Sequence, residues 1–149
     1  MKKVVALLLT FSAAALLAAK SAKDYVNDLS SDDTKVVMEA VKWVGENKEK
    51  SAVQSLVNIL KSSSDSEVKS EAACSLGLIG EKAAVKDLSE VILSENDSDV
   101  RYSIVLAVAR IGIDSRTSYD NLVKAKDKET DPFIKDFIAK MEEKFAKSN

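Results

Sequence analysis

The stretch Ser64–Leu93, SDSEVKSEAACSLGLIGEKAAVKDLSEVIL, decides the fold, because related stretches stand 32 residues before it and 32 residues after it. Each copy is long enough for two short helices joined by a turn. In the first half of each copy, apolar residues recur at i, i+4, i+5 and i+8, the spacing of one buried stripe on an α-helix. The repeat therefore predicts three helical hairpins, over about 32–63, 64–95 and 96–127.

The apolar stripe of the first helix aligns in all three copies, and small residues follow it. The aligned sets are Val36, Val68 and Val100; Ala40, Ala72 and Ile104; Val41, Ala73 and Val105; Val44, Leu76 and Val108; and the small residues Gly45, Gly77 and Ala109. Small side chains let neighbouring helices approach closely. Gly80 and Gly112 then predict helix ends, and Lys48 stands at this place in the first copy.

Polar residues mark the start of each hairpin. Asp32, Ser64 and Asn96 stand 32 residues apart, and each is followed by an aspartate. We expect these three residues to be N-caps, because an oxygen-bearing side chain at that position accepts a hydrogen bond from a free amide of the first turn. The following carboxylate is favoured by the positive end of the helix dipole.

The second helix of each hairpin shows its own apolar positions. They are Val53, Leu56 and Leu60 in the first copy and Val85, Leu88 and Ile92 in the second. In the third copy we expect one deleted residue in the connecting turn. With that deletion, Arg116, Tyr119 and Val123 align with Val85, Leu88 and Ile92.

Two further helices are expected to cap the array, since a repeat buries its apolar face only against neighbours. Residues 23–30 predict a lead-in helix, with Trp43 either packed beneath it or exposed as a binding anchor. At the other end, Asp131 and Pro132 predict the start of a capping helix over 131–146. Its expected apolar stripe is Phe133, Ile134, Phe137, Ile138, Met141 and Phe145.

The N-terminus has the pattern of a secretory signal peptide. Two lysines precede an almost wholly apolar run, Val4–Leu17, and small residues follow. The run is shorter than the roughly 17 to 25 residues that span a bilayer. We therefore predict a signal peptide over 1–21, cut after Ala19 or Ser21, and a mature domain over 22–149.

Composition narrows the classes of function. A cut after Ser21 leaves 19 basic side chains against 24 acidic ones, and this balance disfavours nucleic acid and anionic membranes as partners. The chain has no histidine and one cysteine, Cys74, so we expect no metal site, no cofactor and no histidine-based catalysis. Cys74 is expected to pack in a helix interface, the alternative being a reactive or intermolecular thiol. We expect a protein that is not an enzyme.

The repeat resembles the short HEAT-like repeat of the phycobilisome-lyase type. The residues that carry the resemblance are Asp65 to Lys69 (DSEVK), Asp97 to Arg101 (DSDVR), and the Ile-Gly pairs that end at Gly80 and Gly112. The resemblance implies an all-α fold, a right-handed α-α superhelix or α-solenoid, whose second helices line a concave face that binds a partner. Some members attach bilins, so a chromophore lyase or its accessory subunit is an alternative.

Projection of the second helices predicts which side chains the concave face displays. They are Gln54, Lys86 and Thr117; Ser55, Asp87 and Ser118; and Asn58, Glu90 and Asn121. These polar side chains suit hydrogen bonding to a protein or peptide, although a merely solvated surface would look the same. The leading hypothesis is an exported, periplasmic or secreted scaffold without stable membrane insertion that binds another extracytoplasmic protein. Self-assembly through the capping helix or Cys74 is a further alternative.

Overall fold

The computed structural model describes residues 20–113 and 115–148, and these residues form eight α-helices, one short 3-10 helix and no strand. Most of the predicted signal peptide, residues 1–19, lies outside the described residues. The helices are α2 (Ala22–Asp28), α3 (Thr34–Glu46), α4 (Val53–Ser62), α5 (Ser66–Ile79), α6 (Ala84–Val91), α7 (Ser98–Ile111), α8 (Arg116–Lys128) and α9 (Pro132–Ser148). The 3-10 helix, Lys50–Ala52, leads into α4.

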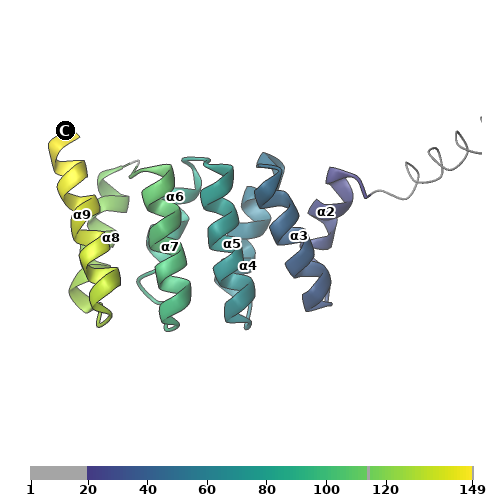
Figure 1. Ribbon diagram of the computed structural model, residues 1–149, viewed down its shortest axis with the longest axis horizontal. Coiled ribbons are helices and arrows are strands. Elements are labelled where there is room, and N and C mark those ends of the chain that lie inside the picture. The colour runs from purple at the N-terminus through teal and green to yellow at the C-terminus, as the bar shows by residue number, and fades with distance from the viewer. Residues whose placement is uncertain (1–19, 114, 149) are drawn as a thin grey trace, which may run out of the picture.

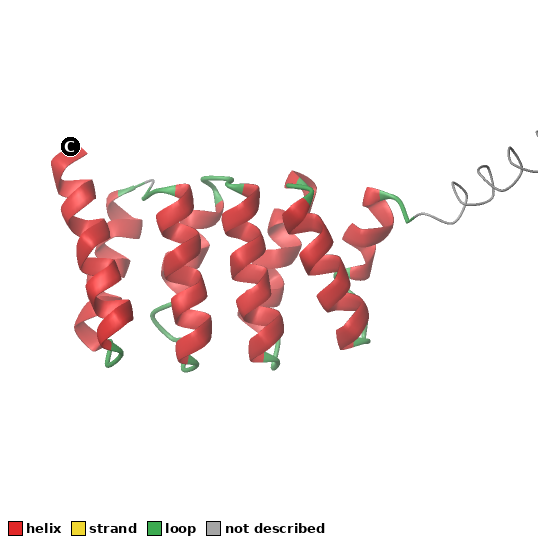
Figure 2. Cartoon of the chain, viewed as in Figure 1, coloured by secondary structure: helices red, strands yellow, loops and turns green. Residues whose placement is uncertain are grey.

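The helices stack in two layers along one axis (Figures 1 and 2). The first helices α3, α5, α7 and α9 form one layer, and the second helices α4, α6 and α8 form the layer behind it. Each helix packs against its counterpart in the next hairpin, and α2 packs on α3 at one end of the array. The predicted all-α solenoid of stacked helical hairpins is confirmed.

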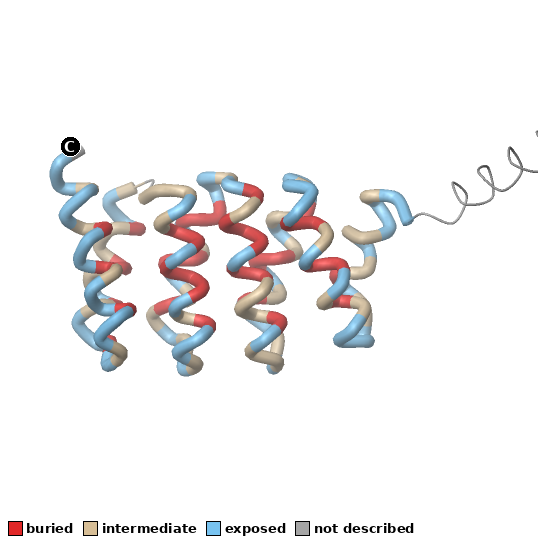
Figure 3. The backbone as a smooth tube through the Cα atoms, in the orientation of Figure 1, coloured by how far each residue is buried: buried red, intermediate tan, exposed pale blue. Residues whose placement is uncertain are grey.

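The core is one continuous cluster between the layers, and no hairpin has a core of its own. Among its fully buried side chains are Leu56 of α4, Leu76 of α5, Leu88 of α6, Ile104 of α7 and Ile138 of α9. Figure 3 shows that buried positions are densest in α5 and α7, in the middle of the array. These helices have a neighbour on each side, so more of their surface is covered.

Successive first helices touch through small residues. The Ser75 hydroxyl of α5 donates a hydrogen bond to the Val41 carbonyl of α3 at 2.8 Å. A Cβ atom placed on Gly45 would lie 2.7 Å from the Cβ of Ser75, and one on Gly77 would lie 3.0 Å from the Cα of Ala107. The predicted close approach at these glycines is confirmed.

The N-cap prediction is wrong by one residue. Asp33, Asp65 and Asp97 are the N-caps, in place of Asp32, Ser64 and Asn96. Their carboxylates accept from the backbone amides two residues further on at 2.8 to 2.9 Å. An aspartate at the cap position can satisfy an amide directly, whereas one residue further into the helix its carboxylate acts only through the dipole.

The predicted helix ends at the aligned glycine positions are confirmed by the backbone. Gly80 is left-handed with φ 78°, and Gly112 also has a positive φ of 96°. Lys48, which takes the place of the glycine in the first hairpin, has φ 52°. The three hairpins thus share a positive φ at this place, although one of them adopts it without glycine.

The lead-in helix α2 covers one end of the stack. Tyr25 of α2 stacks on Trp43 of α3 with ring centroids 4.3 Å apart and an interplanar angle of 6°. The prediction that Trp43 packs beneath the lead-in helix is confirmed. At this end the Tyr25–Trp43 pair covers α3, which has no preceding hairpin to pack against.

Helix α9 covers the other end, with part of the predicted stripe. Ile134, Ile138 and Met141 are buried, but Phe133 is 80% exposed. The prediction for Phe133 is wrong because α9 is displaced by 34 residues relative to α7 at its start: Asp131 corresponds to the cap Asp97, and Ile134 therefore takes the place of Val100.

One largely buried ion pair ties α5 to the loop before α7, and another ties α7 to the loop before α9. Lys69 Nζ lies 2.9 Å from Glu95 Oε2, and Arg101 Nε lies 2.8 Å from Glu129 Oε2. The Glu129 carboxylate also accepts from the amides of Thr130 and Asp131 at 2.9 Å. The Arg101 hydrogen bond lowers the pKa of Glu129 below its ordinary value. The basic residue after each DSxV motif thus connects its own helix to the start of the next first helix, α7 or α9.

Substitution Gly45→Ala is expected to destabilise the protein by about 1–3 kcal/mol, because the added methyl group overpacks the contact with Ser75. Urea unfolding followed by circular dichroism measures this effect. The control is Glu46→Ala at the exposed neighbouring position, which should change stability by less than about 0.5 kcal/mol. An unchanged or raised stability of the Gly45→Ala variant would contradict the close approach.

Substitution Arg101→Met is expected to cost about 3 kcal/mol at pH 7, because it leaves the buried Glu129 carboxylate without its cation. The pKa of Glu129 is lower in the folded state than in the unfolded state. Its contribution to stability is therefore complete above about pH 4.3 and is lost as pH falls through the folded-state pKa.

Urea unfolding between pH 7 and pH 3 tests this expectation, and the difference between wild type and Arg101→Met should shrink on acidification. The control is Lys140→Met, which breaks an exposed ion pair with Asp136 and should cost less than about 1 kcal/mol. A difference that stays constant over the whole pH range would rule out the ion pair as its source.

Candidate binding surface

The second helices α4, α6 and α8 bury one stripe and turn the other side outward. In α4 and α6 the buried stripe includes Leu56, Leu60, Leu88 and Ile92, as the apolar pattern predicts. In α8 the alignment on Arg116, Tyr119 and Val123 is wrong. The buried residues of α8 are Ser118, Asn121, Leu122 and Ala125.

The correct offset between α6 and α8 is 33 residues, so the third hairpin gains a residue where a deletion was expected. Val85 corresponds to Ser118, Leu88 to Asn121 and Ile92 to Ala125. Because the side chains at two of these buried positions are polar, the apolar pattern of α8 does not reveal its register. Leu122, which is fully buried, was the one strong apolar signal in this helix.

The buried polar side chains of α8 have hydrogen-bond partners. The Asn121 amide donates to the Ser89 hydroxyl of α6 at 3.3 Å, and that hydroxyl in turn donates to the Lys86 carbonyl at 2.8 Å. The Ser118 hydroxyl lies within hydrogen-bond distance, 3.0 Å, of the hydroxyl of Ser115, the N-cap of α8. These bonds offset the cost of placing polar groups in the core.

The predicted surface residues therefore divide into three groups. The exposed ones are Gln54, Asn58, Lys86, Glu90 and Thr117, the half-buried ones are Ser55 and Asp87, and the buried ones are Ser118 and Asn121. The placement of Ser118 and Asn121 on the exposed face is wrong. The other seven reach the surface, but Thr117 does not line up with Gln54 and Lys86 in the corrected register.

We use the name second-helix face for the outward side chains of α4, α6 and α8 in the corrected register. They are Gln54, Lys86 and Tyr119; Ser55, Asp87 and Asp120; and Asn58, Glu90 and Val123. The three residues from α8 replace Thr117, Ser118 and Asn121. The signal that could have found them is Leu122, because an offset of 33 places it opposite Ser89 in the buried stripe.

Tyr119 gives this face an aromatic end. Its ring stacks on Phe145 of α9 with centroids 5.0 Å apart, and the Arg116 guanidinium carbon lies 4.8 Å from its centroid. The rest of the face is largely polar: the Gln54 side-chain amide donates to Oδ1 of the Asn58 side chain at 3.2 Å. Lys61 of α4 forms an ion pair with Asp87 of α6. The face is therefore an array of hydrogen-bonding groups that ends at a ring.

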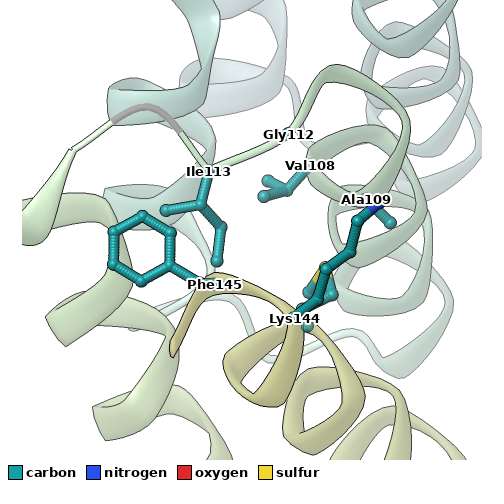
Figure 4. A pocket seen from close by; sticks show the side chains of 7 residues that line it. Val108, Ala109, Gly112, Ile113, Lys144 and Phe145 are labelled. Atoms are coloured by element: carbon teal, nitrogen blue, oxygen red, sulfur yellow. The ribbon is translucent and has the colours of Figure 1, made fainter. Parts of the chain in front are cut away.

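A small pocket of about 160 Å³ lies elsewhere, between the ends of α7 and α9 (Figure 4). Val108, Ile113, Met141 and Phe145 make its walls largely apolar, and Lys144 lies at its edge. It contains none of the predicted site residues, and its wall residue Phe145 stacks on Tyr119 at the end of the second-helix face.

Cys74 lies on the outward side of α5, so the prediction that it packs in a helix interface is wrong. Its neighbours Ala73 and Ser75 face the adjoining helices instead. Partial burial raises the pKa of the Cys74 thiol. At neutral pH it is therefore less ionised than an ordinary cysteine, which makes it a weaker nucleophile.

The part of the chain that the structure describes contains neither a metal-binding cluster nor a membrane-spanning helix. No group of three or more acidic, histidine or cysteine side chains is placed to hold a metal ion there. Within residues 20–113 and 115–148, no helix has the length and apolar character required to cross a bilayer.

Comparison with known families gives one match. A sequence profile described as HEAT repeats matches residues 22–109, more than half of the chain. The match begins with α2 and ends inside α7, before the hairpin in which the register shifts. No curated protein matches the chain.

The corrected register of α8 predicts that Asn121→Asp lowers stability by about 2 kcal/mol or more, because it places a charge in the core. The matched control is Asn58→Asp on the exposed side of α4, which should change stability by less than about 0.5 kcal/mol. Urea unfolding of both variants at pH 7 measures the difference. Equal effects would show that Asn121 is as exposed as Asn58.

Proposed function

Because the chain belongs to the HEAT repeat family, we propose that it is a protein-binding or scaffolding module that uses its second-helix face. HEAT repeats generally mediate protein–protein interaction, and the profile covers α2 to α7. The two layers described above leave the outward side of the second helices open over the length of the array.

The observation that carries the proposal is that this face is polar, exposed and separate from the core. Gln54, Asn58, Lys86 and Glu90 are all exposed on α4 and α6, while the apolar side chains of the same helices point inward. Mixed hydrogen-bonding groups around an aromatic residue such as Tyr119 are typical of protein interfaces. A folded or extended polypeptide is the ligand that such a surface fits best.

The proposal includes a role without catalysis. Catalytic groups need a nucleophile and a base within hydrogen-bond reach. The chain has no histidine, and the aspartates of the hairpin starts are engaged as N-caps. These observations favour binding over chemistry.

We also place the protein outside the cytoplasm. The support is the sequence pattern of the N-terminus, a basic start followed by the apolar run Val4–Leu17. The partner would then be another periplasmic or secreted protein. The finer assignment of the repeats to the phycobilisome-lyase type rests on the DSEVK and DSDVR motifs, whose basic residues form the buried ion pairs.

The proposal predicts that alanine at Gln54, Asn58, Lys86 and Glu90 together weakens partner binding at least tenfold and changes stability by less than about 1 kcal/mol. A photo-crosslinking residue at position 86 of the exported protein first identifies the partner. Binding of the purified partner is then measured by calorimetry, and stability is measured by urea unfolding.

The matched control replaces four exposed polar residues of α9 that also sum to zero charge. They are Lys135, Asp136, Lys140 and Glu143. The control should bind as wild type does, and a crosslinker at position 135 should not capture the same partner. Equal loss of binding in both variants, or no specific crosslink from position 86, would refute the second-helix face as the site.

A further inference from the structure

The outward side of the first helices carries a groove of about 480 Å³, which we call the first-helix groove. One stripe of α5 between Ser66 and Cys74 forms its floor, and residues of α3 and α7 form its sides. Among the described residues, none from α4, α6 or α8 lines it. The groove therefore lies on the layer opposite the second-helix face (Figure 1). Its volume is within the range of roughly 300–1,000 Å³ that is usual for binding sites.

Apolar side chains at the first-helix groove remain open to solvent. Tyr102 of α7 is 43% exposed, and Leu106, one helical turn further along α7, is 37% exposed. They are two of the three large apolar side chains that are exposed within residues 20–113 and 115–148. Met38 of α3 and Cys74 of α5 add apolar surface to the lining. Exposed apolar surface that gathers at one place marks an interaction site.

The charge on the first-helix groove is mostly negative. Four carboxylates and one ammonium group line it: Glu67, Glu71, Asp97, Asp99 and Lys42. Asp97 is the N-cap of α7, and its carboxylate accepts from two backbone amides. The other three carboxylates form no ion pair with any residue that the structure describes. A cationic ligand in the groove therefore meets negative charge that no side chain of the described domain neutralises.

These three carboxylates are spread along the groove. Glu67 and Glu71 stand one turn apart on α5, and Asp99 lies on the neighbouring helix α7. A ligand that pairs with all three needs several cationic groups along one chain. Nucleic acids and anionic lipids bring charge of the wrong sign. A polypeptide with basic and apolar side chains matches both the carboxylates and the exposed apolar surface.

We propose that the first-helix groove binds a basic segment of another protein. Lysine or arginine side chains of that segment pair with Glu67, Glu71 and Asp99, and an apolar side chain packs on Tyr102. The chain then has docking surfaces on both of its layers, as a scaffold that joins two proteins requires. This inference goes beyond the proposed function and does not depend on the second-helix face being a binding site.

Fluorescence anisotropy of a labelled peptide tests the charge requirement. The probe is a peptide with four copies of the sequence Lys-Ser-Leu, and the comparison peptide carries glutamate in place of every lysine. The protein isolated after expression of the full chain should bind the basic peptide saturably, and more weakly as the salt concentration rises. It should not bind the acidic peptide. Absence of saturable binding of the basic peptide, or equal binding of both peptides, overturns the proposal.

The double substitution Glu71→Gln with Asp99→Asn should weaken binding of the basic peptide about fivefold, because two charge pairs are lost while the side-chain shapes are kept. The matched control is Asp127→Asn with Glu143→Gln, which removes the same charge from exposed positions of α8 and α9. The control should bind within about twofold of wild type. Equal losses in the two variants would show unspecific attraction to an acidic chain and overturn the proposal.

Cys74 reports where the peptide binds, because the chain's single thiol is exposed and lies on the groove floor. Saturating basic peptide should slow the modification of Cys74 by N-ethylmaleimide about threefold or more, as followed by intact mass. The acidic peptide should leave the rate unchanged. Saturable binding of the basic peptide without protection of Cys74 places the peptide elsewhere on the chain. That result overturns this inference and leaves the proposed function of the second-helix face intact.

Discussion

The close contact between successive first helices is the constraint on which the rest of the structure depends. Gly45 lies against Ser75 and Gly77 against Ala107, and at neither glycine is there room for a larger side chain without movement. Once this spacing is set, the cations near the starts of α5 and α7 can reach the acids before α7 and α9. The contact thus fixes both the stacking of the hairpins and the ion pairs that link them.

Stacking makes each hairpin depend on its neighbours, so the two ends need covers of different chemistry. At the N-terminal end the Tyr25 ring stacks flat on Trp43, and the Lys20 ammonium group lies over the Tyr25 ring. At the other end Ile134 and Ile138 of α9 are buried, while Lys135, Asp136 and Lys140 lie on its exposed side together with Phe133.

The candidate surface was partly predictable. Gln54, Asn58, Lys86 and Glu90 were placed correctly because the apolar stripes of α4 and α6 are unambiguous. In α8 the stripe contains a serine and an asparagine, and hydrophobic periodicity has no means to recognise a polar side chain whose partner lies on another helix. Ser89 supplies that partner, and it comes from 32 residues earlier in the chain.

By itself the sequence determined the helices, the hairpin period and the places of close approach, because periodicity and glycine positions act locally. The tertiary structure alone decided which of two adjacent residues meets a neighbour. It made Asp65 the cap in place of Ser64, exposed Cys74 and Phe133, and buried Asn121. Burial depends on where the next helix lies, and a shift of one or two residues along a helix turns a side chain from the core to the solvent.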